Sequence, residues 1–147
     1  MKYSVIIENS LISTGWFPGR RVDVEGVIGK LKNEGYPAGS AVKVFLEEFG
    51  GLSGMHKGYR GDDWEEFHFD PIIAMEGIFR ERVIDYELRF GDGLTPIGEA
   101  YNQHLVLLIS EKGAMLGAYD DYLCVLGESV EIGFQALFES KDGVDVP

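Results

Sequence analysis

Cysteine and long apolar runs are both scarce in this sequence. The single cysteine, Cys124, lies in the apolar stretch 122–126. The chain can therefore form no internal disulfide, and we expect a core thiol in a protein of a reducing compartment. No apolar run approaches the roughly 20 residues that span a bilayer. The start, MKYSVIIENS, also lacks the basic segment and cleavage site of a signal peptide. We predict a cytoplasmic protein without a membrane partner.

Basic side chains are few relative to acidic ones. The chain has 13 lysines and arginines against 25 aspartates and glutamates, for a formal net charge of -12. A field of this sign repels a phosphate backbone, so we expect no nucleic-acid partner. The same field steers a basic protein toward the surface, or it serves only to keep a monomer soluble. A monomer is the favoured state.

Recognisable catalytic motifs are also missing. The sequence has no Walker-type phosphate loop, no G-x-S-x-G, no H-E-x-x-H and no cysteine pair for zinc. Its histidines, His56, His68 and His104, have no motif spacing between them. We therefore predict no enzyme, no cofactor and no metal.

The remaining pattern predicts one α+β domain over residues 1–147. Residues 4–14 fit a short helix that ends at Gly15, although Val5, Ile6 and Ile7 fit the start of a strand equally well. Apolar residues at helical spacing predict a helix capped by Asp23 that ends before Gly35, and another capped by Ser40 that ends before Gly50. Residues 77–90 fit either a helix or a strand, and we choose the helix. Ser129 is expected to cap a C-terminal helix.

Short apolar runs separated by turn residues predict an antiparallel-rich sheet of about five to six strands, packed against the N-terminal and C-terminal helices. The expected strands are 52–55, 66–69, 94–97, 105–110, 115–119 and 122–126. Lys112-Gly113 and Asp120-Asp121 are plausible hairpin turns.

The most site-like segment is 55–71, MHKGYRGDDWEEFHFDP. Its histidines and carboxylates are possible divalent-metal ligands, although the spacing does not fit an EF-hand loop. The alternative is a solvated acidic loop, with Phe67 and Phe69 facing the core and His68 and Asp70 facing outward. Trp64, set among acidic residues, is either an interface anchor or packed under the loop.

Exposed acidic residues around one aromatic ring are typical of a protein interface with a basic partner. The candidate partner-binding residues are therefore Asp62, Asp63, Trp64, Glu65, Glu66, Asp120 and Asp121. For the last two, turn formation is a better explanation than a catalytic carboxylate pair.

Six segments stand out when they are taken in order: GWFPGRRVD at 15–23, AVKVFLEEFGGL at 41–52, FHFDP at 67–71, TPIGEA at 95–100, LVLLIS at 105–110 and GESVEIGFQALFE at 127–139. Together they resemble the third subgroup of the SUKH superfamily of bacterial immunity proteins. The resemblance covers nearly the whole chain. Most of these residues have an architectural explanation: Trp16 is expected to be buried, and Arg20 either pairs with a carboxylate such as Asp70 or has a binding role.

The resemblance implies a protein that binds and neutralises a cognate toxin domain, often a nuclease, without catalysis. An acidic face would then occlude the basic cleft of the toxin. Two alternatives stay open: an intracellular scaffold or regulatory binder with the same fold, and a metal-dependent hydrolase that uses His56, Asp62, Asp63 and His68.

Overall fold

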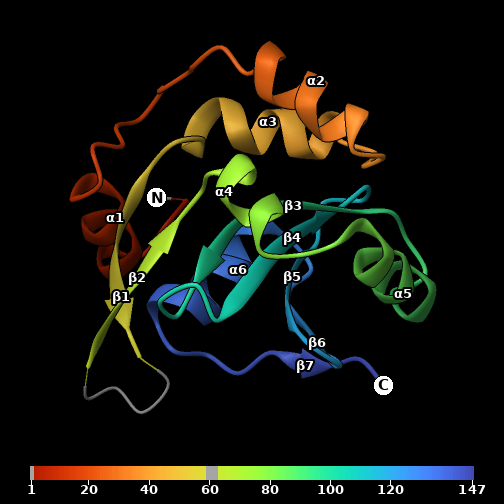
Figure 1. The fold of residues 1–147 in the computed structure, drawn as a ribbon. Helices are drawn as coiled ribbons and strands as arrows, with labels where there is room; N and C mark the ends of the chain where they lie inside the picture. The colour runs from red at the N-terminus through yellow and green to blue at the C-terminus, as the bar shows by residue number, and fades with distance from the viewer. Residues whose placement is uncertain (1, 59–62) are drawn as a thin grey trace.

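The computed structural model describes residues 2–58 and 63–147 of the chain. In these residues runs of helices and runs of strands make up an α+β protein (Figure 1). The helices are α1 (Val5–Ile12), α2 (Glu25–Asn33), α3 (Ser40–Phe49), α4 (Pro71–Glu76), α5 (Arg80–Phe90) and α6 (Val130–Phe138). The strands are β1 (Ser53–Lys57), β2 (Trp64–His68), β3 (Leu94–Ala100), β4 (Leu105–Ser110), β5 (Met115–Tyr119), β6 (Tyr122–Gly127) and β7 (Val144–Asp145).

The described strands form one antiparallel sheet in the order of the sequence, from β1 at one edge to β7 at the other. This meander places the β1–β2, β3–β4 and β5–β6 connections at one end of the sheet, which we call the hairpin end. The β4–β5 turn lies at the opposite end. β3 and β4 are buried at every residue. Because side chains alternate between the two faces of a strand, both faces of these central strands are covered.

Aromatic side chains from the helices and from β2 fill the core on one side of the sheet. Phe45 of α3 and Phe134 of α6 have ring centroids 6.2 Å apart. Phe69, which follows β2, packs against both of them. Figure 1 shows α6 behind the central strands, with α2 and α3 along the top of the view and α5 at the right. These aromatic contacts hold α3 and α6 together over the sheet.

Three helices begin at residues whose side chains cap them as their chemistry predicts. Ser4 accepts from the Ile7 N–H of α1 at 3.3 Å, and Ser129 accepts from the Ile132 N–H of α6 at 3.3 Å. Asp70 accepts from the first N–H groups of α4 and is followed by Pro71 at the first helical position. A proline is favoured there because its missing N–H has no intrahelical partner.

Two predicted caps are wrong by one residue. Val24 occupies the cap position of α2, while Asp23 lies before it and accepts from the Glu25 N–H at 3.0 Å. Ser40 is the first helical residue of α3, and Gly39 precedes it without a side-chain cap. Helical periodicity locates such helices well. A polar residue near the start of a helix, however, can be the cap, the residue before the cap or the first helical residue, and the sequence does not decide between these positions.

The strand count was underestimated, because the described residues form seven strands rather than five to six. The missed strand, β7, has two residues and no alternation to detect. The short α4 was also missed, since six residues are too few to show a repeating pattern of apolar positions. The helical choice at 77–90 is confirmed by α5, which ends at Gly91 in the left-handed conformation.

Arg20 does not pair with Asp70 as expected. Its guanidinium donates to the Glu48 carbonyl at 2.6 Å and to the Gly50 carbonyl at 3.0 Å. Carbonyls at the end of a helix have no intrahelical donor, so Arg20 satisfies two of them at the end of α3. Trp16 is buried as predicted, and so is Cys124.

Candidate partner-binding surfaces

The hairpin end carries most of the acidic residues that the sequence singled out. Asp63, Trp64, Glu65 and Glu66 lie at the tip and start of β2, and Asp120 and Asp121 form the β5–β6 turn. Asp62 lies outside the described residues. β3 and β4 lie between β2 and β5 in the sheet, so two strands separate the two groups. A single protein partner can span that separation.

The tip of β2 has the composition of an interface. Trp64 is 57% exposed, so it is not part of the core. The Lys57 ammonium lies over its ring, 4.4 Å from the centroid. Asp63 and Glu66 are exposed beside it, while Glu65 is half-buried near the Asn102 amide, 3.5 Å away. An aromatic ring with carboxylates around it can anchor a basic partner.

The β5–β6 turn is partly engaged in structure. Asp120 takes a positive φ of 48°, and its carbonyl accepts from the Tyr86 hydroxyl at 2.6 Å. The Asp121 carboxylate pairs with the Arg82 guanidinium at 3.1 Å. The turn explanation of these aspartates is therefore confirmed. Their side chains nonetheless stay exposed.

His56 and His68 use both ring nitrogens inside the fold. Nδ1 of His56 donates to the Lys57 carbonyl at 2.7 Å, and its Nε2 accepts from the Tyr101 N–H at 3.1 Å. Nδ1 of His68 accepts from the Asp70 N–H at 3.0 Å, so its Nε2 carries the proton and donates to Glu99 at 2.7 Å. The expectation that His68 faces solvent is wrong, because the side chain is only 13% exposed.

The hydrogen bonds of these two histidines leave no ring lone pair for a metal ion. Among the described residues, no three histidine, cysteine or carboxylate side chains are grouped as metal ligands would be. The geometry of His56 and His68 thus gives the hydrolase alternative no support.

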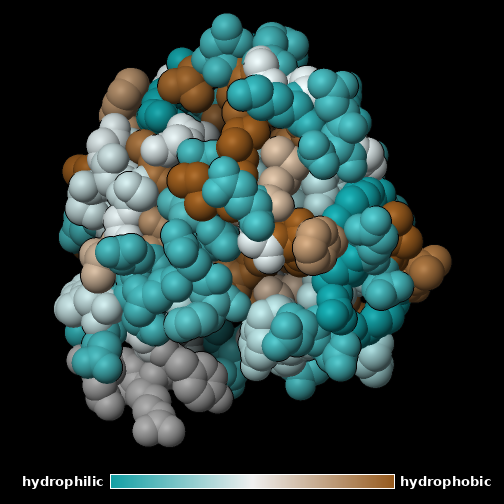
Figure 2. Space-filling model, viewed as in Figure 1, coloured by the Kyte–Doolittle hydropathy of each residue, from teal (hydrophilic) through white to brown (hydrophobic). Residues whose placement is uncertain are grey.

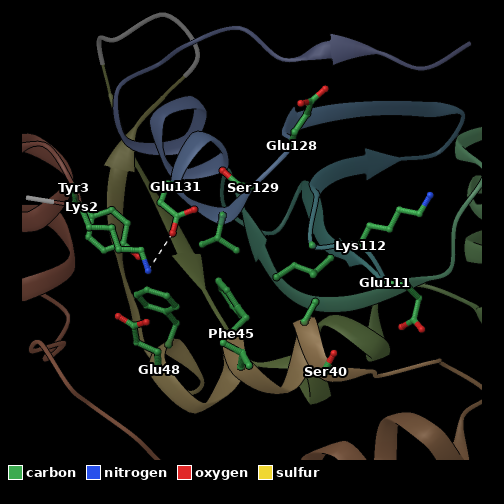
Figure 3. Close-up of a pocket in the computed structure, with 16 residues that line it drawn as sticks. Lys2, Tyr3, Ser40, Phe45, Glu48, Glu111, Lys112, Glu128, Ser129 and Glu131 are labelled. Carbon is green, nitrogen blue, oxygen red and sulfur yellow. Dashed lines mark ion pairs between the residues drawn. The ribbon is translucent and has the colours of Figure 1, made fainter.

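A second acidic surface lies at the opposite end of the sheet. Here a hollow of about 510 Å³ opens between α3, the β4–β5 turn and the start of α6 (Figure 3). Its floor is apolar, with Phe45 and Phe49 of α3 and Ile109 of β4, and the exposed Val44 lies at its rim. We call it the α3–α6 hollow.

Charged residues from four distant segments line this hollow. The carboxylates are Glu48, Glu111, Glu128 and Glu131, and the ammonium groups are Lys2 and Lys112. Glu131 pairs with Lys2 at 3.0 Å through Oε1, as the dashed line in Figure 3 marks. Glu48 accepts from the Trp16 indole Nε1–H at 2.9 Å through Oε2. Carboxylates outnumber ammonium groups two to one, so the hollow favours a positively charged guest.

Tyr3 stands in the wall of the hollow with an unsatisfied hydroxyl. Its side chain is 5% exposed and packs edge-on against Trp16 and tilted against Phe134. Among the described residues the hydroxyl oxygen finds no hydrogen-bond partner. Burial raises the pKa of Tyr3 well above its usual value, and the nearby carboxylates of Glu48 and Glu131 raise it further. Both of these carboxylates line the hollow, whereas the hydroxyl oxygen itself is buried.

Sequence reasoning missed this second surface entirely. Glu48 and Glu131 read as ordinary helical residues in EEFG and GESVE, and nothing in the pattern indicates that their segments meet. Only the packing of α3 against α6 brings them together. The nearest sequence signal was the family-like segments around them, which identified a fold rather than a site.

Apolar side chains are exposed on α4 and α5. Ile73, Phe79 and Leu88 are 40%, 80% and 79% exposed. Figure 2 shows apolar groups over α4 and along α5, with polar groups between them. Separate apolar residues of this kind are normal on protein surfaces, so they single out no partner.

The fold and its surfaces define an α+β protein that presents carboxylates at both ends of an antiparallel sheet. Comparison with protein families gives the particular family: the SUKH-3 immunity protein family matches residues 3–140. The chain therefore belongs to the SUKH-3 immunity protein family, as the sequence motifs indicated. The comparison with curated proteins gave no match, and neither did that with solved structures. In the part of the chain that the structure describes, no helix is long and apolar enough to cross a membrane.

Proposed function

We propose that this protein binds a cognate bacterial toxin domain of basic, nuclease type in the cytoplasm and occludes its active site. Membership of an immunity-protein family supports a toxin partner. A nuclease cleft is basic because it holds a phosphate backbone. An acidic immunity protein competes for that cleft through charge complementarity.

The observation that carries the proposal is the exposed aromatic and acidic tip of β2 at the hairpin end. Trp64 supplies apolar area, and Asp63 and Glu66 supply charge beside it. A standard interface covers about 800 Å² on each partner. A patch of that size reaches from β2 to the β5–β6 turn, so Asp120 and Asp121 can join the same contact.

Calorimetric titration tests the proposal. The partner is the toxin domain encoded beside the gene, made as a catalytically inactive variant and titrated at low and high salt. We expect one-to-one binding that weakens as salt screens the opposed charges. Nuclease activity of the active toxin should fall in step with the fraction bound.

Two charge reversals locate the contact. Glu66→Lys at the hairpin end should slow association, whereas Glu34→Lys, an equal change at the exposed end of α2, should not. Failure of the toxin to bind at either salt concentration would refute the proposal and favour a scaffold role for the same fold. Equal effects of the two reversals would remove the hairpin end from the interface.

A further inference from the structure

We infer that a hollow at the hairpin end anchors a projecting basic loop of the toxin domain. It measures about 1240 Å³ and opens between the β3–β4 turn, the β5–β6 hairpin and residues 140–145. We call it the tyrosine hollow, because Tyr101, Tyr119 and Tyr122 line it. The inference rests on the proposed function for the identity of the partner. It adds which part of the hairpin end holds that partner and by what contacts.

The size and the lining of the tyrosine hollow suit a loop. Leu105 of β4, Cys124 of β6 and Ala136 of α6 line it and are buried, so its deepest part reaches the core. Pockets for small molecules have volumes of about 300–1,000 Å³, so this hollow has room for more than one side chain. Concave surfaces of this kind are filled by loops that project from a partner protein.

Two tyrosines line the exposed part of the hollow, beside the β5–β6 turn. Tyr119 and Tyr122 are paired across the two strands, with ring centroids 5.0 Å apart. They are 51% and 37% exposed, and neither belongs to the hydrophobic core. Tyrosine is enriched at the energetic centres of interfaces, because it offers a large apolar area and loses little conformational entropy on binding. These two rings are therefore available to a partner.

The β3–β4 turn, which also lines the hollow, has an uncommon backbone. Tyr101, Asn102 and Gln103 follow one another with φ values of 52°, 56° and 73°. Residues other than glycine rarely take this left-handed conformation, so a run of three is costly. Asn102 holds it in place, because its N–H donates to the Glu66 carbonyl at 3.0 Å and its side-chain oxygen accepts from the Glu66 N–H at 2.8 Å. Costly conformations enforced by their surroundings are concentrated at binding sites.

The same hydrogen bonds connect the hollow with the tip of β2. Tyr101 and His104 of the turn line the hollow. Glu66, which Asn102 contacts, lies in β2 together with the exposed Trp64. The turn therefore stands between the Trp64 ring and the tyrosine hollow, and a partner that contacts both must pass over it.

Carboxylates around the hollow favour a basic occupant. Asp142 and Asp145 line it, and Asp120 lies in the turn between the two tyrosines. All three residues are exposed. Lys141 is the one lysine or arginine among the described lining residues. The negative field attracts a basic loop, and the faces of tyrosine rings attract lysine and arginine side chains as well.

Calorimetric titration with the catalytically inactive toxin domain tests the inference through single variants. Tyr122→Ala should weaken binding about tenfold or more, and Tyr119→Ala severalfold, because each removes an aromatic contact. Phe17→Ala is the matched control and should leave the affinity unchanged. Phe17 is 56% exposed. It lies just before Arg20, which is bound at the end of α3, where β1 begins and not at the hairpin end.

A charge reversal tests the basic character of the loop. Asp142→Lys should weaken toxin binding severalfold at low salt and much less at high salt, because salt screens the exposed charge. Glu34→Lys, an equal change at the exposed end of α2, should have no such effect. The loss in Tyr122→Ala should be similar at both salt concentrations.

Thermal unfolding of each variant separates binding from folding. Tyr119 and Tyr122 lie outside the core, so their alanine variants should unfold cooperatively near the parent's melting temperature. Tyr122→Phe retains the ring and should retain most of the toxin affinity. If Tyr122→Ala does not fold, Tyr119→Ala and Asp142→Lys carry the test.

The outcomes distinguish this inference from the proposed function. If the parent protein binds toxin, unchanged affinity in both alanine variants of the tyrosines would overturn the inference and leave the immunity function standing. Equal losses in Tyr122→Ala and Phe17→Ala would overturn it too. Absence of toxin binding by the parent at either salt concentration would refute the proposed function and this inference together.

Discussion

The His68 imidazole donates to the Glu99 carboxylate across 2.7 Å at the residue pair where β2 and β3 are in register. Within the described residues this is the single ladder pair between the two strands. The β1–β2 hairpin, which carries Trp64, is therefore joined to the rest of the sheet through a side-chain hydrogen bond as well as through backbone. The position of the hairpin end depends on this contact.

Replacing His68 with phenylalanine should destabilise the protein by about 3–5 kcal/mol, because it leaves the buried Glu99 carboxylate without its donor. Glu99→Gln retains an acceptor for Nε2 and should cost about 1 kcal/mol. Urea unfolding measures both. Costs of equal size for the two variants would contradict the donor role of His68.

Gly98→Ala should destabilise the protein by about 2–3 kcal/mol through overpacking. A Cβ on Gly98, beside the irregularity in β3, would lie 2.1 Å from the His68 carbonyl oxygen, and backbone cannot easily move away. Gly26→Ala is the control, since a Cβ there meets nothing within 4 Å. It should stabilise α2 by about 0.5–1 kcal/mol, and a loss of stability in both variants would refute the steric explanation.

Arg20→Met should lower the free energy of unfolding by about 1–3 kcal/mol, because two carbonyls at the end of α3 lose their donors. Its neighbour provides the control: Arg21 is 78% exposed on its side chain and pairs only at the surface with Glu47. Arg21→Met should change stability by less than about 0.5 kcal/mol. Thermal and urea unfolding measure both variants. Similar losses of stability in Arg20→Met and Arg21→Met would contradict the capping role of Arg20.

The stability of the protein should fall as the pH drops below neutral, partly through His56. Burial lowers the pKa of His56 below 6.5, its ordinary value, despite the opposing hydrogen bond to Lys57. As the pH falls from about 6.5 toward the lowered folded-state pKa, the unfolded chain takes up a proton before the folded protein does. The contribution of His56 to the free energy of unfolding therefore decreases as the pH falls between these two pKa values. Above about pH 6.5 this contribution is constant.

Unfolding of the parent and of His56→Gln between pH 5 and pH 7.5 measures this contribution. Glutamine can donate to the Lys57 carbonyl and accept from the Tyr101 N–H but has no charge to gain. The variant should lose less stability over this range. Identical pH profiles for the two proteins would exclude His56 as a titrating group of the fold.

The sequence predicted the α+β class and the order of most elements. Apolar runs bounded by turn residues and a serine cap explain this success: β4 and β5 occupy the predicted ranges, and α6 begins after the predicted Ser129 cap. The contacts that depend on tertiary packing were not predictable. Arg20 finds the carbonyls of α3, and His68 finds Glu99, because elements distant in sequence meet there. The α3–α6 hollow is invisible in the sequence for the same reason.

The order of the sheet also shapes how the chain can reach its fold. Every strand pairs with its neighbour in sequence, so most of the sheet can assemble one hairpin at a time with short loops to close. Two steps differ. α6 intervenes between β6 and the two-residue β7, and α4 and α5 intervene between β2 and β3, where a single ladder pair makes the joint. A β3–β6 core that forms early, followed by later docking of the β1–β2 hairpin, would make that hairpin the part of the sheet to open first under native conditions. Amide hydrogen exchange would then proceed faster in β1 and β2 than in β4 and β5.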